Sequence, residues 1–313
     1  MILEQREKTQ ELTAVVIMGF CFLLVYCLAI SLVQPFASSE VIEPAFENPD
    51  DPINILYIFV IMLVFTVVIL LIARFWKKQL IQFIILGAIG YTAFYAFFLP
   101  IFTLLIPMTT FHIHLLVSLL CALILVAILF KFPEWYVIDI TGIIVGTSAI
   151  IIFGISLNVF LVILLLICLA IYDAISVYKT KHMIDLADAV MDLKLPVLLV
   201  VPKVRHYSLI KETKRLKEKI EEGEEREAFF MGLGDIVMPG ILIEAVYVSS
   251  AQGFIVTLGT IIGTLIGFSI LMRFVLTGRP QAGLPLLCGG AILGYVITSV
   301  LLFETMFELS FPF

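Results

Sequence analysis

The long apolar stretches of this chain constrain its fold more than any other feature. Hydrophobic residues make up 62% of the 313 positions and charged residues only 14%. A helix needs about 20 predominantly apolar residues to cross the hydrocarbon core of a bilayer. Nine windows reach that length: Thr13–Val33, Ile53–Ala73, Gln79–Leu99, Phe111–Phe130, Tyr136–Ser156, Leu157–Tyr178, Phe229–Ser249, Gln252–Met272 and Leu284–Phe303. The sequence therefore predicts an all-α polytopic membrane protein with nine transmembrane helices.

The basic residues orient the predicted helices. If the nine windows alternate in direction, all 19 Lys and Arg side chains fall on one side of the membrane, mostly between the sixth and seventh windows. Because basic residues concentrate in cytoplasmic loops, we expect a cytoplasmic N-terminus and a C-terminus outside. The chain then divides into an N-terminal six-helix bundle (residues 1–178), a cytoplasmic loop (179–228) and a C-terminal three-helix unit (229–313).

Motifs typical of metal, nucleotide or serine-nucleophile chemistry are missing from the sequence. All five cysteines lie inside apolar windows without metal-ligand spacing, and no P-loop, HExxH or GxSxG pattern occurs. His112 and His114 are two residues apart, which directs their rings to different faces of a helix, so an interfacial structural role is favoured over metal binding. We predict no metal, no cofactor and no nucleic-acid partner.

Two aspartates lie inside apolar windows, Asp173 near the end of the sixth and Asp235 near the start of the seventh. A charge in hydrocarbon costs at least about 2.5 kcal/mol, so such carboxyls indicate a functional site. At the rise of an α-helix, Asp173 lies about 8 Å and Asp235 about 9 Å from the cytoplasmic edge. Because the intervening loop returns the chain to the same face, the two carboxyls can face each other.

Two glycines precede the second aspartate. Gly232 and Gly234 flank Leu233, and small residues permit close approach of helices in lipid. Each glycine also weakens a helix by about 1 kcal/mol, so an unwound segment from Met231 to Gly234 can admit water and an extended peptide. A plain helix contact is the alternative interpretation.

These residues resemble a known family. Tyr172–Asp173 and Gly232–Asp235 are similar to the YD and GxGD motifs of presenilin and signal peptide peptidase, the intramembrane aspartyl proteases. The third family motif, Pro-Ala-Leu at the head of the last span, is matched by Pro285–Leu287 with Leu in place of Ala, a departure that concerns the shape of the substrate cleft. The resemblance covers nearly the whole chain. Short termini and a compact loop are closest to a microbial, archaeal-type homologue, which implies the cell membrane of a prokaryote.

The resemblance implies an aspartic endopeptidase in which Asp173 and Asp235 are catalytic. Two carboxyls within about 3 Å cannot both ionise, so one activates a water while the other, protonated, polarises the scissile carbonyl. The implied partners are membrane-spanning polypeptides and the lipid bilayer, and a need for accessory subunits or a homo-oligomer stays open. The candidate motif and substrate-binding residues are Tyr172, Gly232, Leu233, Gly234, Leu284, Pro285, Leu286 and Leu287.

A transmembrane substrate must be unwound before it is cut, and its freed backbone needs partners in lipid. The segment LPVLLVVP, Leu195–Pro202, is a β-branched run bounded by prolines and can offer a strand edge to the substrate. A stretch embedded in the membrane surface is the alternative. Pro285 restricts Leu284 toward an extended conformation, which predicts an unwound start of the last span.

A proton- or cation-coupled transporter or leak channel is the alternative function, and a non-catalytic chaperone or scaffold is a third. Glu244 shares the seventh window with Asp235, about 13 Å further along the axis, and intramembrane carboxylates can form a relay. No inverted repeat of the kind found in many transporters is evident. Asp139 and Glu244 are otherwise expected to snorkel or to be paired.

Overall fold

The structure, a computed structural model, describes residues 2–37, 45–46, 48–75, 78–100, 111–180, 198–204, 207–209, 227–249, 253–277 and 281–303. This part of the chain contains nine α-helices, and each overlaps one of the nine predicted windows. The helices are α1 (Ile2–Ala37), α2 (Ile53–Phe75), α3 (Lys78–Pro100), α4 (Phe111–Lys131), α5 (Trp135–Ser156), α6 (Val159–Ile175), α9 (Leu233–Ser249), α10 (Gly253–Leu276) and α11 (Gly283–Phe303). A π-helix, Ser176–Thr180, continues α6.

Apolar length makes this an integral, multi-pass membrane protein. Six of the described helices, α1, α4, α5, α6, α10 and α11, contain a segment long and apolar enough to cross a membrane. In α2 and α3, which have 23 residues each, the apolar parts with described side chains are Ile53–Phe65 and Gln82–Phe98, and α9 has 17 residues. Many large apolar side chains on these helices are exposed, among them Leu63, Ile124 and Leu301, as expected of surfaces that meet lipid. The count of nine spans stays a prediction.

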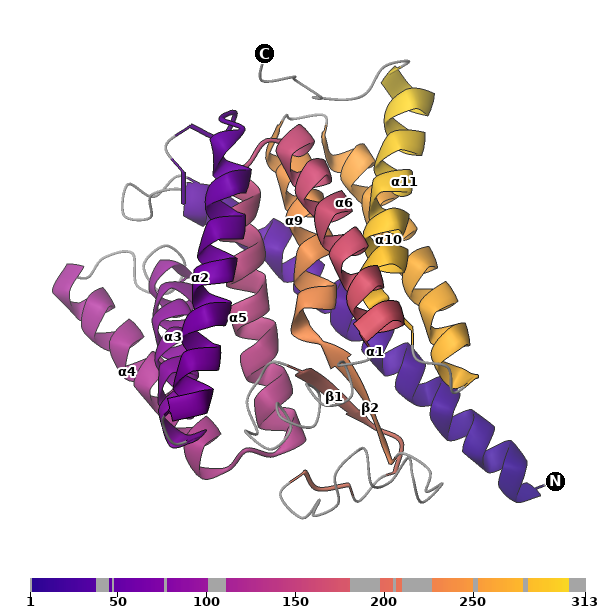
Figure 1. The fold of residues 1–313 in the computed structure, drawn as a ribbon, viewed down its shortest axis with the longest axis horizontal. Helices are drawn as coiled ribbons and strands as arrows, with labels where there is room; N and C mark the ends of the chain where they lie inside the picture. Colours follow the sequence, from indigo (N-terminus) through magenta and orange to yellow (C-terminus); the bar gives the residue numbers. More distant parts are fainter. Residues whose placement is uncertain are drawn as a thin grey trace.

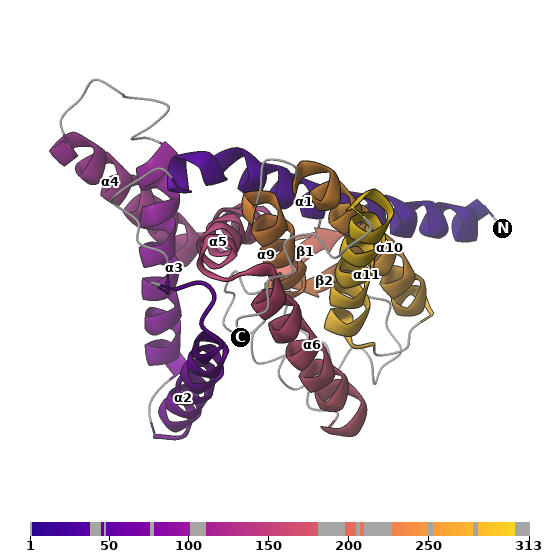
Figure 2. The same ribbon diagram turned by 90° about the horizontal axis from the view of Figure 1, so that it is seen from above.

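The helices form two groups on either side of α5. The first group is α2, α3 and α4, and the second is α6, α9, α10 and α11 (Figure 1). Seen from above, α1 runs along one face of both groups (Figure 2), in contact with α5, α9 and α10. The main hydrophobic core lies among α1, α5, α6, α9, α10 and α11, so α9 is packed on several sides.

Glycines bring α10 and α11 to backbone contact. A Cβ added at Gly263 would collide with the carbonyl oxygen of Gly290 and would lie 2.8 Å from the Cα of Gly294. Close approach of this kind is how small residues stabilise helix pairs in lipid. The contact fixes the position of α11, whose first turn reaches the two aspartates.

A small sheet precedes α9 and corrects the sequence prediction. Strand β1 (Leu198–Pro202) pairs antiparallel with β2 (Ala228–Gly232). The sequence predicts helix from Phe229 onward, but α9 begins at Leu233 and Asp235 lies in its first turn, so the predicted start of this helix is wrong. The reason is that a short apolar run has no period that separates a strand from a helix. The strand predicted in Leu195–Pro202 is confirmed from Leu198 on, and residues 195–197 lie outside the described ranges.

The ladder of this sheet decides which backbone groups point outward. The Lys203 N–H donates to the carbonyl oxygen of Glu227 at 2.8 Å, which continues the register of the sheet by one pair. In an antiparallel ladder, hydrogen-bonded and non-hydrogen-bonded pairs alternate. The residues whose backbone groups face away from the partner strand are therefore Leu198, Val200 and Pro202 on β1, and Ala228, Phe230 and Gly232 on β2.

Candidate active site

Asp173 lies two residues before the end of α6 and is half-buried. The Leu284 N–H donates to its Oδ2 at 3.1 Å, and the backbone of Gly283 provides a second hydrogen bond. Both N–H groups belong to the first turn of α11, where a helix has no internal acceptor for them. A helix N-terminus therefore holds the Asp173 carboxyl.

Asp235 lies in the first turn of α9 and is held from the strand that precedes it. The backbone of Gly232, the last residue of β2, hydrogen bonds to the Asp235 carboxyl. A Cβ at Gly232 would lie 3.4 Å from Asp235 Oδ2, in van der Waals contact with the carboxyl. Asp235 also interacts electrostatically with Asp173. The structure thus brings the two predicted catalytic residues into one site.

Gly283 joins the two aspartates and was not among the residues selected from the sequence. While its backbone bonds to Asp173, a Cβ on Gly283 would lie only 2.9 Å from Asp235 Oδ2 and 3.0 Å from Asp235 Cγ. The space that a side chain would fill is therefore occupied by the Asp235 carboxyl. The sequence feature that could have indicated this residue is its position directly before Leu284–Pro285.

Tyr26 of α1 is a second residue that sequence reasoning missed. Its hydroxyl donates to the carbonyl oxygen of Ile236 at 3.1 Å, beside Asp235, and its side chain is fully buried. The bond ties the backbone of α9 to α1 next to Asp235. No pattern in the sequence indicates this contact, because the two residues are 210 positions apart.

The residues of the YD and GxGD motifs have different roles. The Tyr172 side chain is exposed and makes no hydrogen bond to any residue that the structure describes. Leu233 Cδ1 lies 3.3 Å from the Cβ position of Gly146 on α5, so Leu233 anchors the start of α9. A Cβ at Gly234 would meet nothing within 4 Å. Gly232 ends β2, and neither glycine has a residue of a described helix other than α9 within 4 Å of its Cβ position, so the expectation that they serve close helix packing is wrong.

The residues at the head of the last span are helical. The sequence predicts an extended Leu284, but α11 begins at Gly283, so that prediction is wrong. A proline fits in the first turn because its missing N–H is one that the helix leaves unbonded, and Pro285 occupies such a position. Leu287 is fully buried in the main core, and the carbonyl of Leu286 packs against Gly267. Of the four described residues Leu284–Leu287, only Leu284 forms a hydrogen bond to an aspartate.

The two other acidic residues of the spans lie apart from the dyad of Asp173 and Asp235. Asp139 accepts a hydrogen bond from the Val200 N–H, which confirms the expected pairing. Glu244 is fully buried, and neither carboxyl oxygen bonds to a described residue, so the expectation of snorkelling or pairing is wrong there. Nine residues are about 2.5 helical turns, so Glu244 and Asp235 lie on opposite sides of α9. That arrangement does not form a relay.

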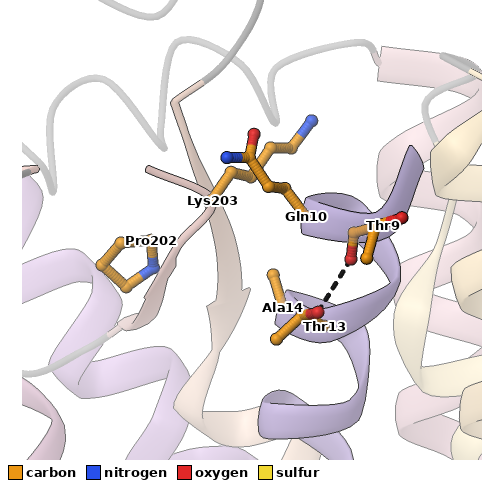
Figure 3. A pocket seen from close by; sticks show the side chains of 6 residues that line it. All are labelled: Thr9, Gln10, Thr13, Ala14, Pro202 and Lys203. Atoms are coloured by element: carbon orange, nitrogen blue, oxygen red, sulfur yellow. Dashed lines mark hydrogen bonds between the residues drawn. The ribbon is translucent and has the colours of Figure 1, made fainter. Parts of the chain in front are cut away.

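A separate pocket of about 280 Å³ lies between α1 and the end of β1, lined by Thr9, Gln10, Thr13, Ala14, Pro202 and Lys203 (Figure 3). It contains neither aspartate. The Lys203 ammonium lies 2.6 Å from Glu11 and 4.5 Å from the centre of the Phe229 ring, so Lys203 ties the sheet to α1. Among the described residues no group of three or more His, Cys, Asp or Glu side chains is placed to bind a metal.

Comparisons with known proteins agree with this geometry. A family model described as signal-peptide peptidase, presenilin aspartyl protease matches residues 19–304. Two solved structures of a presenilin family intramembrane aspartate protease, in the C222 and P2 space groups, are similar to the chain. The first has 33% identity and a TM-score of 0.68, covering 92% of this chain and 99% of its own. The second has 34% identity and a TM-score of 0.65, covering 91% and 96%.

A search among curated proteins found no match. The family model nevertheless spans most of the chain, both solved structures cover nearly all of it at over 30% identity, and the described fold brings Asp173 and Asp235 into one electrostatically interacting pair. The chain belongs to the signal peptide peptidase and presenilin family of intramembrane aspartyl proteases.

Proposed function

We propose that this protease hydrolyses peptide bonds within membrane-spanning segments of other proteins and that Asp173 and Asp235 are its catalytic residues. The observation that carries the assignment is the Gly283–Leu284 segment. Its backbone bonds to Asp173, and its glycine lies against the Asp235 carboxyl. One turn of α11 therefore sets the spacing of both carboxyls.

The chemistry follows from a pair of carboxyls that share one proton. Close carboxyls do not both ionise, so one removes a proton from a water while the other donates a hydrogen bond to the scissile carbonyl oxygen. The water oxygen bonds to the carbonyl carbon, and the resulting tetrahedral intermediate breaks its C–N bond as a proton passes to the leaving amine. The shared proton belongs to the pair of Asp173 and Asp235 and to neither alone.

The substrate segment binds as an additional strand on the outer edge of β2. Strand addition supplies the backbone partners that an unwound segment lacks in lipid. The outward backbone groups of Phe230 have no hydrogen bond to any described residue, and β2 continues directly into α9. A strand on this edge lies beside Asp235, which is three residues beyond Gly232. The scissile bond is then delivered to the carboxyls by pairing with β2.

A nine-span topology with a cytoplasmic N-terminus, an external C-terminus and a place in a prokaryotic cell membrane fits this function. Supporting it, each predicted window overlaps a described helix, and the start of α1 and the end of α11 lie at opposite ends of the bundle (Figure 1). All 19 basic residues fall on one side in this arrangement. The sheet and both aspartates then lie toward the cytoplasmic face.

The test is cleavage of a single-span reporter polypeptide by the purified protein, in detergent and in liposomes. Asp173→Ala and Asp235→Ala are each expected to remove nearly all activity, because residues that act as one unit fail together. Glu244→Gln is the matched control, since it neutralises a buried carboxyl of α9 on the opposite side from Asp235. Substantial cleavage by either alanine variant would contradict the assignment. Ion flux without cleavage would favour the transporter alternative.

A further inference from the structure

Asp139 is a buried carboxyl of α5 that the chemistry above does not use. The residue is 9% exposed, and its Oδ1 accepts a hydrogen bond from the Val200 N–H at 2.8 Å. Val200 is the central residue of β1, and its N–H faces away from β2. Asp139 therefore occupies the backbone position at which a further strand would pair with β1.

At its C-terminal end this outer edge of β1 has no donor. Pro202 also faces outward and has no N–H to donate. Beyond β1, the Glu134 side chain at the start of α5 accepts hydrogen bonds from Ser208 Oγ at 2.7 Å and from the Leu209 N–H at 3.2 Å. Asp139 of α5 and Glu134, the residue before α5, thus bind β1 and the residues that follow it. The sheet is attached to α5 through its β1 side.

The two edges of the sheet therefore differ in their attachment, since the outer edge of β1 is bonded to α5 at Val200. Within the described residues, only the Gly232 backbone on the outer edge of β2 is bonded, and its partner is Asp235 itself. A two-stranded sheet is marginally stable alone, so its position depends on attachments such as the one to Asp139. A slip of β1 along β2 by two residues would displace β1 by roughly 6.6 Å and remove part of the support of the strand that leads directly into α9 and Asp235.

We propose that Asp139 is a positioning residue for proteolysis, which closes the outer edge of β1 and fixes the sheet so that a substrate strand pairs only with β2, in one register relative to Asp235. This inference rests on the proposed strand addition at β2. Asp139 acts through Val200 and does not touch the substrate. Its effect is on where, and how productively, the substrate is cut.

The experiment compares wild type with Asp139→Ala, Asp139→Asn and Ser148→Ala. Asn keeps an oxygen acceptor for the Val200 N–H. Ser148→Ala removes a buried hydroxyl of α5 that bonds within its own helix, to Ile144, and serves as the matched control. For each variant, kcat and KM are measured on the single-span reporter, the cleavage positions are mapped by mass spectrometry, and amide hydrogen exchange is followed in a peptide that covers β1.

Asp139→Ala is expected to lower kcat/KM about tenfold, to spread cleavage over neighbouring positions, and to raise amide exchange in β1. Asp139→Asn is expected to restore all three properties, and Ser148→Ala to leave them unchanged. An Asp139→Ala enzyme with unchanged cleavage positions and kcat/KM would overturn the proposal. An inactive wild type would instead overturn the proposed function. Even with an inactive wild type, unchanged amide hydrogen exchange of β1 in Asp139→Ala would overturn the closing of the β1 edge.

Discussion

Gly283→Ala is expected to impair catalysis without destabilising the fold. The added Cβ would lie 2.9 Å from Asp235 Oδ2, 3.0 Å from Cγ and 3.1 Å from Oδ1. Ordinary contacts are longer, so the Asp235 carboxyl must retreat by about 0.5 Å from the turn that holds Asp173. Since a displacement of about 1 Å costs about 100-fold in rate, we expect kcat to fall about tenfold.

The other parameters should distinguish this effect from unfolding. Alanine is favoured over glycine in a helix by up to about 1 kcal/mol, so the Tm of Gly283→Ala should not decrease. KM should change little, because the β2 edge is untouched. The assay is steady-state cleavage of the reporter together with thermal unfolding in the same detergent.

The matched control is Gly289→Ala, six residues further along α11, where a Cβ meets no described residue within 4 Å. It should have the kcat of the wild type. A Gly283→Ala enzyme with unchanged kcat would refute the idea that this glycine sets the spacing of the two carboxyls. An equal decrease of kcat in both variants would show that any added methyl group on α11 lowers activity, whether or not it lies beside Asp235.

Two further predictions follow from the dyad and from Glu244. For cleavage by Asp173 and Asp235, kcat/KM should have a bell-shaped dependence on pH. Both carboxyls are protonated at low pH and both are ionised at high pH, and neither of these forms can act. A rate that still rises at about pH 9 would indicate a different catalyst. Glu244→Met should raise the free energy of unfolding by about 1–3 kcal/mol, because it removes a buried carboxyl without a described partner. Thermal unfolding of the wild type and the variant measures this difference. A destabilised variant would indicate that Glu244 has a partner.

The sequence by itself determined the class of protein, the helices and the two aspartates. Bilayer thickness fixes the length of an apolar span, and this requirement is local in the chain, so all nine windows have a described helix. Asp173 and Asp235 were selected for a similar reason, because a carboxyl inside an apolar window is costly wherever the rest of the chain lies. The GxGD pattern added the chemical class.

Tertiary structure alone decided how the site is held. The strand at Ala228–Gly232 forms because β1 is available to pair with it, and a short apolar run carries no signal for that choice. Gly283, Tyr26 and Asp139 form hydrogen bonds to distant residues, as the Tyr26–Ile236 contact across 210 positions illustrates. Such contacts depend on the packing of α1, α5 and α11 around α9, which no local pattern in one sequence specifies.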